Sequence, residues 1–174
     1  LWPRKTDEPG DLDERVRLGT NRLTNGDCEA ETAWTGGAVR YSDTAHQGKQ
    51  SLQVGTAMVS QEISKYLGTH VTWVLEFFYR AAPEAAGATL TAGLKVDGRV
   101  PSTVGRAYDA GPAWDFGRIV TKSGAASQTI AAGFLAEGGE VLVDDVTLRQ
   151  IRFPSINHLH YEPLYEVEPL ILTN

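Results

Sequence analysis

The sequence predicts an all-β protein, a sandwich or barrel of short antiparallel strands. Short apolar segments recur along the chain at a spacing of about 8–12 residues, with turn signals between them. The dipeptides Asn25-Gly26 and Asp97-Gly98 tolerate positive φ and are typical of tight turns. Apolar residues at helical spacing are nowhere sustained over about three turns, so no long helix is expected.

The first expected strands are short. Val39 and Tyr41 alternate with polar neighbours, which indicates a strand around 39–41. A turn at 47–49 leads into a strand at 51–54. Residues 58–63 form another short extended segment.

The clearest strand is expected at 71–80, because its residues separate onto two different faces. The odd-numbered residues of this segment are all large and apolar, which predicts a core face. The even-numbered residues include Glu76, Phe78 and Arg80, so the second face mixes charge with an aromatic ring. That mixture is unusual for a face that only meets solvent.

Five further strands complete the expected sandwich. Residues 89–96 alternate and end at the Asp97-Gly98 turn, and 100–108 is expected to pair back against them. Strands at 114–121 and 127–135 follow. A last strand, 140–148, closes the series.

The closing strand carries two adjacent carboxylates, Asp144 and Asp145. Strands usually exclude Asp, and successive side chains point to opposite faces, so the two cannot both face solvent. One of them should meet a cation or a cluster of backbone N–H groups. Acidic residues also occur at 25–29, and we expect this segment to meet the closing strand and complete the sandwich.

Composition bounds the class of protein. A chain of 174 residues is long enough for one domain with a core, plus tails. The net charge of −6 argues against nucleic acid as a partner. No apolar run approaches the roughly 20 residues that span a bilayer. The single cysteine, Cys28, excludes an intrachain disulfide framework without excluding an extracellular location.

The domain boundaries follow shifts in composition. Residues 1–18 have the composition of an arm or linker, 19–151 form the expected β-sandwich, and 152–174 form an extended tail or the start of a following domain. The chain begins at Leu1 without a signal-like segment. We therefore expect a processed or excised piece, whose compartment cannot be read from its terminus.

A set of ordered motifs extends this interpretation, with the order more specific than any single motif. The motifs are 21–29, Trp34, 48–54, Gln61 before Ile63, 73–79, Trp114 and 143–148. The chain resembles the β-jelly-roll carbohydrate-binding modules fused to xylanases and glucanases, within the galactose-binding-like superfamily. The resemblance covers about 21–151 and implies a jelly-roll β-sandwich of two antiparallel sheets with extended N- and C-terminal arms. One departure is Cys28, where the family usually has Phe; a small buried apolar role is expected for it.

The resemblance implies a structural calcium ion where the first and last strands meet. It assigns side-chain ligands to Glu29 and Asp144, with backbone carbonyls around Asp27 and of the Lys49 turn completing the shell of oxygens. The alternative is that Asp144 accepts hydrogen bonds from turn amides, with no metal.

The resemblance also implies sugar binding on a concave sheet, by aromatic faces flanked by polar groups. Trp34, Trp73 and Trp114 match structural positions and are expected in the core. Glu76 and Arg80, two residues apart on one face, could instead pair with each other. The candidate ligand-binding residues are Glu76, Phe78 and Arg80, joined from neighbouring strands or loops by Tyr41, Tyr108 and Gln128.

An enzyme is not expected. A glycosidase needs two carboxylates flanking a cleft, whereas the resemblance places Glu29 and Asp144 at an edge joint. The sequence contains no Ser-His-Asp order, nucleophile elbow or metal-ligand spacing of histidines.

We therefore expect a non-catalytic domain of a larger extracellular, cell-surface or periplasmic protein that binds a polysaccharide or other glycan. The alternative is a structural or assembly module that binds a neighbouring domain or subunit, with the apolar tail from Ile151 as a contact. An exposed Phe78 in an open groove favours the first function. A groove occupied by 151–174 favours the second.

Overall fold

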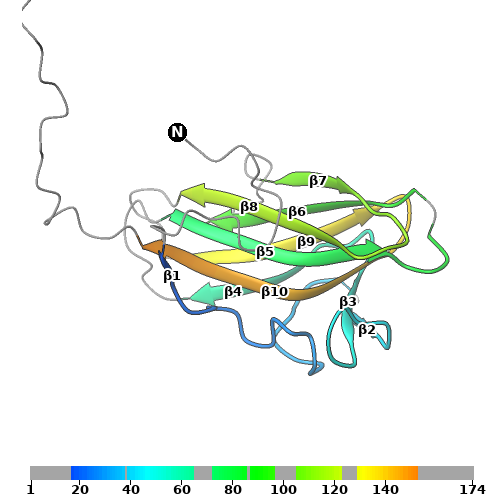
Figure 1. The fold of residues 1–174 in the computed structure, drawn as a ribbon, viewed down its shortest axis with the longest axis horizontal. Coiled ribbons are helices and arrows are strands. Elements are labelled where there is room, and N and C mark those ends of the chain that lie inside the picture. The colour runs from blue at the N-terminus through cyan, green and yellow to red at the C-terminus, as the bar shows by residue number, and fades with distance from the viewer. Residues whose placement is uncertain are drawn as a thin grey trace, which may run out of the picture.

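The computed structural model describes residues 17–37, 39–64, 72–85, 87–96, 105–122 and 129–152. These residues form ten strands and no helix, arranged as two antiparallel sheets packed face to face (Figure 1). The predicted all-β jelly-roll sandwich is confirmed. Within this part of the chain, no helix is long and apolar enough to cross a membrane. The predicted arms lie almost entirely outside the described residues.

The two layers are called here the front sheet and the back sheet. The back sheet has four strands, in the order β4 (Val59–Ser64), β9 (Thr129–Glu137), β6 (Thr89–Val96) and β7 (Arg106–Asp109). The front sheet has six strands. Their order is β2 (Arg40–Ser42), β3 (Ser51–Val54), β10 (Val141–Arg152), β5 (Thr72–Ala81) and β8 (Asp115–Lys122), and β1 (Arg17–Leu18) also pairs with β10.

Strand positions follow the predicted ones closely. β6 has the predicted bounds, and β7 pairs back against it, with Thr89 opposite Asp109. The Asp97-Gly98 turn that was expected between them lies outside the described residues. β10 is longer than expected and reaches Arg152, because β5 pairs with it as far as Gln150 and β1 pairs with Ile151 and Arg152.

The core lies between the sheets and is built as the alternation in β5 predicts. Trp73, Leu75 and Phe77 are fully buried on the inner face of the front sheet. The ring of Phe77 meets Phe134 of β9 and Tyr108 of β7, with centroids 5.1 and 5.4 Å apart. Contacts of this kind join the two layers and bury the apolar surface that stabilises the fold.

The amino-terminal segment lies along β10, as the two acidic segments predict. Val146 N donates to Gly26 O at 2.7 Å, and Arg22 N donates to Leu148 O at 2.9 Å. The Asn21 side chain adds a bridge, because its Oδ1 accepts from Leu148 N at 2.9 Å and its Nδ2 donates to Val146 O at 3.2 Å. These bonds satisfy backbone groups of β10 at an irregular point of the sheet.

That irregular point is a β-bulge between Asp144 and Thr147, at which Asp145 adopts φ of 48°. A bulge interrupts the alternation of side chains. As a result, both carboxylates contact the loop between β2 and β3 rather than pointing to opposite faces. The expectation from strict alternation is corrected here, although Asp144 is fully buried, as one of the two had to be.

Candidate binding site

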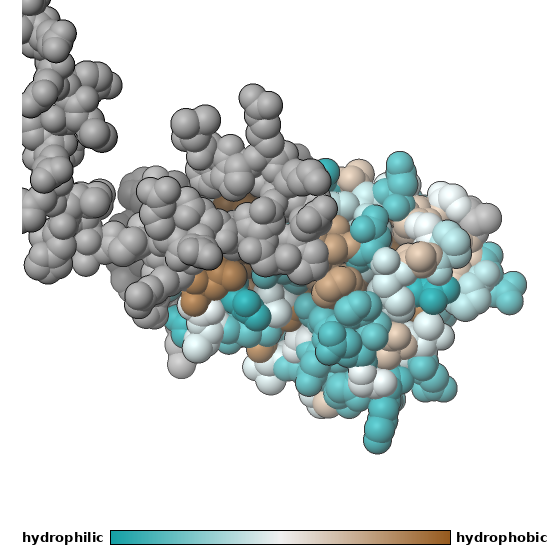
Figure 2. Space-filling model, in the orientation of Figure 1, coloured by the Kyte–Doolittle hydropathy of each residue, from teal (hydrophilic) through white to brown (hydrophobic). Residues whose placement is uncertain are grey.

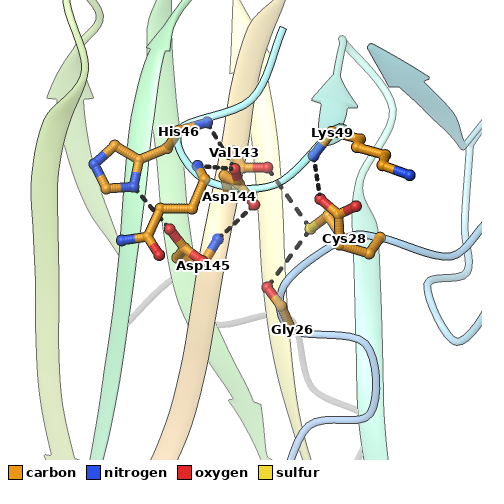
Figure 3. Close-up of polar contacts among 9 residues, drawn as sticks. Gly26, Cys28, His46, Lys49, Val143, Asp144 and Asp145 are labelled. Carbon is orange, nitrogen blue, oxygen red and sulfur yellow. Dashed lines mark hydrogen bonds and ion pairs between the residues drawn. The ribbon is translucent and has the colours of Figure 1, made fainter. Parts of the chain in front are cut away.

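The loop at 43–50, between β2 and β3, is fixed against the outer face of the front sheet by the Asp144 carboxylate (Figure 3). Asp144 Oδ2 accepts from His46 N at 2.8 Å and from Gln47 N at 3.2 Å. Its Oδ1 accepts from Asp145 N at 2.7 Å. Asp144 therefore meets a cluster of backbone N–H groups, one of the two partners predicted for it.

Burial dominates the electrostatics of this carboxyl group. Desolvation raises the pKa of Asp144 to about 6, although the three amide hydrogen bonds act in the opposite direction. Glu29 differs because it is exposed: the N–H groups of Lys49 and Gln50 donate to its Oε1 at 2.6 and 3.2 Å and lower its pKa. A Cβ on Gly48 would lie 2.0 Å from the same oxygen, so glycine is required for this approach.

Cys28 lies between these two carboxylates, where the resemblance places a Phe. Its Sγ is 3.6 Å from Gly26 O and 3.8 Å from Val143 O (Figure 3). The side chain is fully buried, and burial raises the pKa of the thiol to about 12. A thiol that stays protonated packs as a small apolar group, the role predicted for it.

These donors do not fit the expected calcium ion. Calcium requires six to eight converging oxygens, whereas Lys49 presents its N–H to Glu29, and the carbonyls of Gly26 and Val143 lie beside the Cys28 sulfur. Asp27 is exposed. Among the described residues, no three His, Cys, Asp or Glu side chains are grouped closely enough to hold a metal. The predicted calcium ion would therefore require these donors to rearrange.

His46 covers the ring that was expected to be open to a sugar. Its imidazole stacks on Phe78 with centroids 3.7 Å apart and planes 10° from parallel, and it meets the edge of Trp114 at 5.6 Å. Its Nδ1 lies 2.7 Å from Asp145 Oδ2, which fixes the ring in place. No sequence signal identified His46, because its place over β5 depends on the bulge and on the buried Asp144.

Glu76 is also engaged within the protein. Arg118 of β8 directs Nε and Nη2 to Glu76 Oε1 at 2.9 and 2.7 Å, and Thr147 donates to Oε2 at 3.5 Å. The side chain of Arg118 is only 1% exposed. Glu76 therefore pairs across strands with Arg118 and not with Arg80, the partner considered from the sequence.

Arg80 lies at the end of β5, next to Trp114. Its Nε donates to the carbonyl of Ala81 at 3.3 Å, and its guanidinium carbon is 5.9 Å from the centroid of the Trp114 ring. Trp114 is only partly buried and packs with His46 and Arg80 rather than inside the sandwich. This corrects the core position expected for it, whereas Trp34 and Trp73 are in the core as predicted.

The structure does not bring the remaining predicted ligand residues to this face. Tyr108 belongs to the back sheet and is buried in the core, where its hydroxyl donates to Arg118 O at 2.9 Å. Tyr41 packs against the core from β2. Gln128 lies outside the described residues.

Two hollows open at the end of the sandwich where β5 ends and β10 begins. The smaller, ≈ 290 Å³, is lined by Arg40, Gln53 and Glu140 together with loop residues. The Glu140 carboxylate accepts from Gln53 Nε2, and its Oε1 lies 3.4 Å from Arg40 Nη1. The larger, ≈ 670 Å³, lies beside Arg80. Figure 2 shows the outer face of the front sheet, on which hydrophilic side chains predominate towards the end where β5 ends and β10 begins.

Comparison with known proteins places the fold. No family model and no curated protein matches the chain. Among solved structures, it is similar to a family 22 xylan-binding domain from Paenibacillus barcinonensis, with a TM-score of 0.60 and 17% identity over 73% of this chain and 91% of that one. It is also similar to a family 61 carbohydrate-binding module in complex with β-1,4-galactotriose, with a TM-score of 0.56 and 17% identity over 76% of this chain and 99% of that one.

A third similarity widens the range of proteins that use this sandwich. The enzymatically active domain of tailspike protein 4 from bacteriophage CBA120 matches with a TM-score of 0.55 and 17% identity, over 75% of this chain but only 21% of that one. The chain therefore spans nearly the whole of the two binding modules and a small part of the tailspike protein. At these identities the likeness concerns the fold alone: this chain is a jelly-roll β-sandwich, the fold that it shares with these carbohydrate-binding modules.

Proposed function

We propose that this domain binds a glycan across the outer face of the front sheet, at the end that carries the two hollows. The observation that carries the proposal is the partly buried indole of Trp114, held beside Arg80 on one side of β10, with Gln53 and Glu140 on the other side. An aromatic face binds the C–H face of a pyranose, and amide and carboxylate groups bind its hydroxyls.

The stacking of His46 shifts the proposed site away from the middle of β5. A sugar placed on Phe78 would have to displace an imidazole that is stacked at 3.7 Å and bonded to Asp145. Trp114 is only partly buried, with Arg80 over its ring and His46 nearly perpendicular to it, so part of the indole is accessible. The proposed contact is therefore Trp114 and not Phe78.

Binding without catalysis fits the carboxylates described on this face. Glu76 is paired with Arg118, Asp144 is held by amides, and Glu140 is engaged by Arg40 and Gln53. A glycosidase needs one carboxyl group for proton transfer and a second that serves as nucleophile or base across the cleft. We therefore propose a targeting domain of a larger exported or cell-surface protein, as the similarity to carbohydrate-binding modules supports.

The test is binding of xylan, β-glucan and β-1,4-galactan by affinity electrophoresis and calorimetry. Trp114→Ala is expected to weaken binding about tenfold or more, since a lost stacking contact of about 1.4 kcal/mol corresponds to that factor. Val120→Ser is the matched control, because Val120 is a partly exposed residue of β8 away from both hollows. A folded wild-type chain that binds none of the three would refute the proposal.

A second candidate function is assembly with another domain or subunit. The observation that favours it is Val120 of β8, a large apolar side chain that is 39% exposed and lies opposite Val74 of β5. The expected contact through 151–174 falls almost wholly outside the described residues. Sedimentation of the full chain over a range of concentrations tests self-association, and Val120→Asp should abolish it. A concentration-independent monomer would exclude a homomeric role.

A further inference from the structure

We propose that the hollow beside Arg80 accepts the carboxylate of an acidic sugar unit, so that the glycan recognised carries a hexuronate. This inference rests on the proposed glycan-binding function and adds a charge selectivity to it. Three features support it: the ion-pair and hydrogen-bond partners of Arg80, the walls of the hollow, and the neighbouring Trp114.

Arg80 differs from Arg118 and Arg40, each of which has a carboxylate partner. Arg118 forms an ion pair with Glu76 at 2.7 Å, and Arg40 lies 3.4 Å from Glu140. Arg80 donates only its Nε, to the carbonyl of Ala81. In the part of the chain that the structure describes, no carboxylate lies within ion-pair distance of it, and its two terminal amino groups have no hydrogen-bond partner.

A guanidinium in this state is suited to an external carboxylate. Its N–H groups form a planar fork that matches the two oxygens of a carboxylate, and such charge-assisted bonds are about twice as strong as neutral ones. Arg80 is partly buried beside the Trp114 ring, 5.9 Å from its centroid. Less conformational entropy is lost when a held side chain binds than when a free one does.

The hollow supplies space and apolar walls. Its volume of ≈ 670 Å³ lies in the range of small-ligand sites. The walls are formed by the loops after β5 and β7, whose amides are used within the protein: Ala81 N donates to Gly111 O at 2.7 Å, and Ala82 N donates to Glu140 O at 2.9 Å. Arg80 is thus the one cationic group among the residues that line the hollow.

The arrangement places both parts of a uronate in contact with matching groups. The carboxylate meets the Arg80 fork, and the C–H face of the ring lies against the indole of Trp114. Glu84, also in the wall, is exposed and carries the opposing charge. Repulsion from Glu84 should weaken the binding of a uronate without removing the preference for it over a neutral sugar. Removing the Glu84 charge should therefore raise that preference, whereas removing the Arg80 charge should abolish it.

The experiment uses calorimetry on the full chain with two matched pairs of probes. The first is a xylo-oligosaccharide with one glucuronate branch against its unbranched counterpart, and the second is an oligogalacturonate against a β-1,4-galacto-oligosaccharide. The acidic member of at least one pair should bind about tenfold tighter, with a preference that falls as salt is raised. The readout is the acidic-to-neutral affinity ratio.

Variants separate the carboxylate contact from a general loss of binding. Arg80→Gln should bring the ratio to about one, Arg80→Lys should keep part of it, and Glu84→Gln should raise it. Arg22→Gln, a control at an exposed arginine that lines neither hollow, should leave the ratio unchanged. Thermal unfolding of each variant checks that it is folded.

The outcomes also separate this inference from the function on which it rests. A ratio near one in the wild type, with neutral glycans bound, overturns the uronate site and leaves the proposed function standing. The same holds if Arg80→Gln weakens both members of a pair equally. No binding of any probe overturns both.

Discussion

Asp144 places a carboxyl group inside the protein with three backbone N–H donors, and no cationic side chain among the described residues is bonded to it. Because its pKa is raised to about 6 from an ordinary 3.8, the folded state takes up a proton between these values. The stability this protonation contributes is full below about pH 4 and is lost as the pH rises through 6. At neutral pH the buried charge costs on the order of 3 kcal/mol at most.

Asp144→Asn tests this assignment, with unfolding followed in chelator from about pH 2.5 to about pH 7.5. The variant should gain stability relative to the wild type as the pH rises, because only the wild type then acquires the buried charge. Glu29→Gln is the matched comparison with the opposite sign. The pKa of Glu29 is lowered, so the wild type gains stability from it above its ordinary value of 4.5 and loses it as the pH falls. Parallel pH curves for all three proteins would contradict the assignment.

At the level of a single element, β8 depends on a glycine. A Cβ on Gly117 would lie 2.3 and 2.4 Å from ring atoms of Phe77, the aromatic centre of the core. Gly117 is directly opposite Phe77 in the pairing of β8 with β5, and the Phe77 ring occupies the space that a side chain at Gly117 would take. Gly117 therefore leaves room for the Phe77 ring on the inner face of the front sheet.

Gly117→Ala should destabilise the domain by about 1–3 kcal/mol, the usual effect of overpacking a core. Urea unfolding gives the measurement. Gly111→Ala is the control, because no atom lies within 4 Å of the Cβ it would add. If both variants shift the midpoint equally, the close approach at Phe77 does not limit the strand.

The bulge in β10 is the element that organises the candidate site. It turns Asp145 to the side of Asp144, and the two carboxylates then fix the loop at 43–50, which brings His46 over Phe78. The sequence signalled that two acidic residues in a strand needed partners. It could not signal the bulge, because the bulge depends on pairing between β10 and β5, far apart in the chain.

At the scale of the whole molecule, the amino-terminal segment pairs with β10, and calcium was expected where these two segments meet. The amide hydrogen bonds of Glu29 and Asp144 hold the loop without a cation in the described arrangement. We therefore expect the same melting temperature in excess calcium and in chelator. A rise in calcium that Asp144→Ala removes would instead establish the ion and require the Lys49 turn to rearrange.

Local pattern by itself determined the strands and the core face of β5, because alternation and turn chemistry act between neighbours in the chain. The meeting of the two acidic segments was inferred separately, from carboxylates that needed partners. The ordered motifs determined the jelly-roll type. Tertiary structure alone decided that Glu76 pairs with Arg118, that Tyr108 enters the core and that His46 covers Phe78. It also left Arg80 beside Trp114. Each of these depends on which strands become neighbours across the sheets, and a side chain's own segment carries no record of the partner that long-range pairing brings to it.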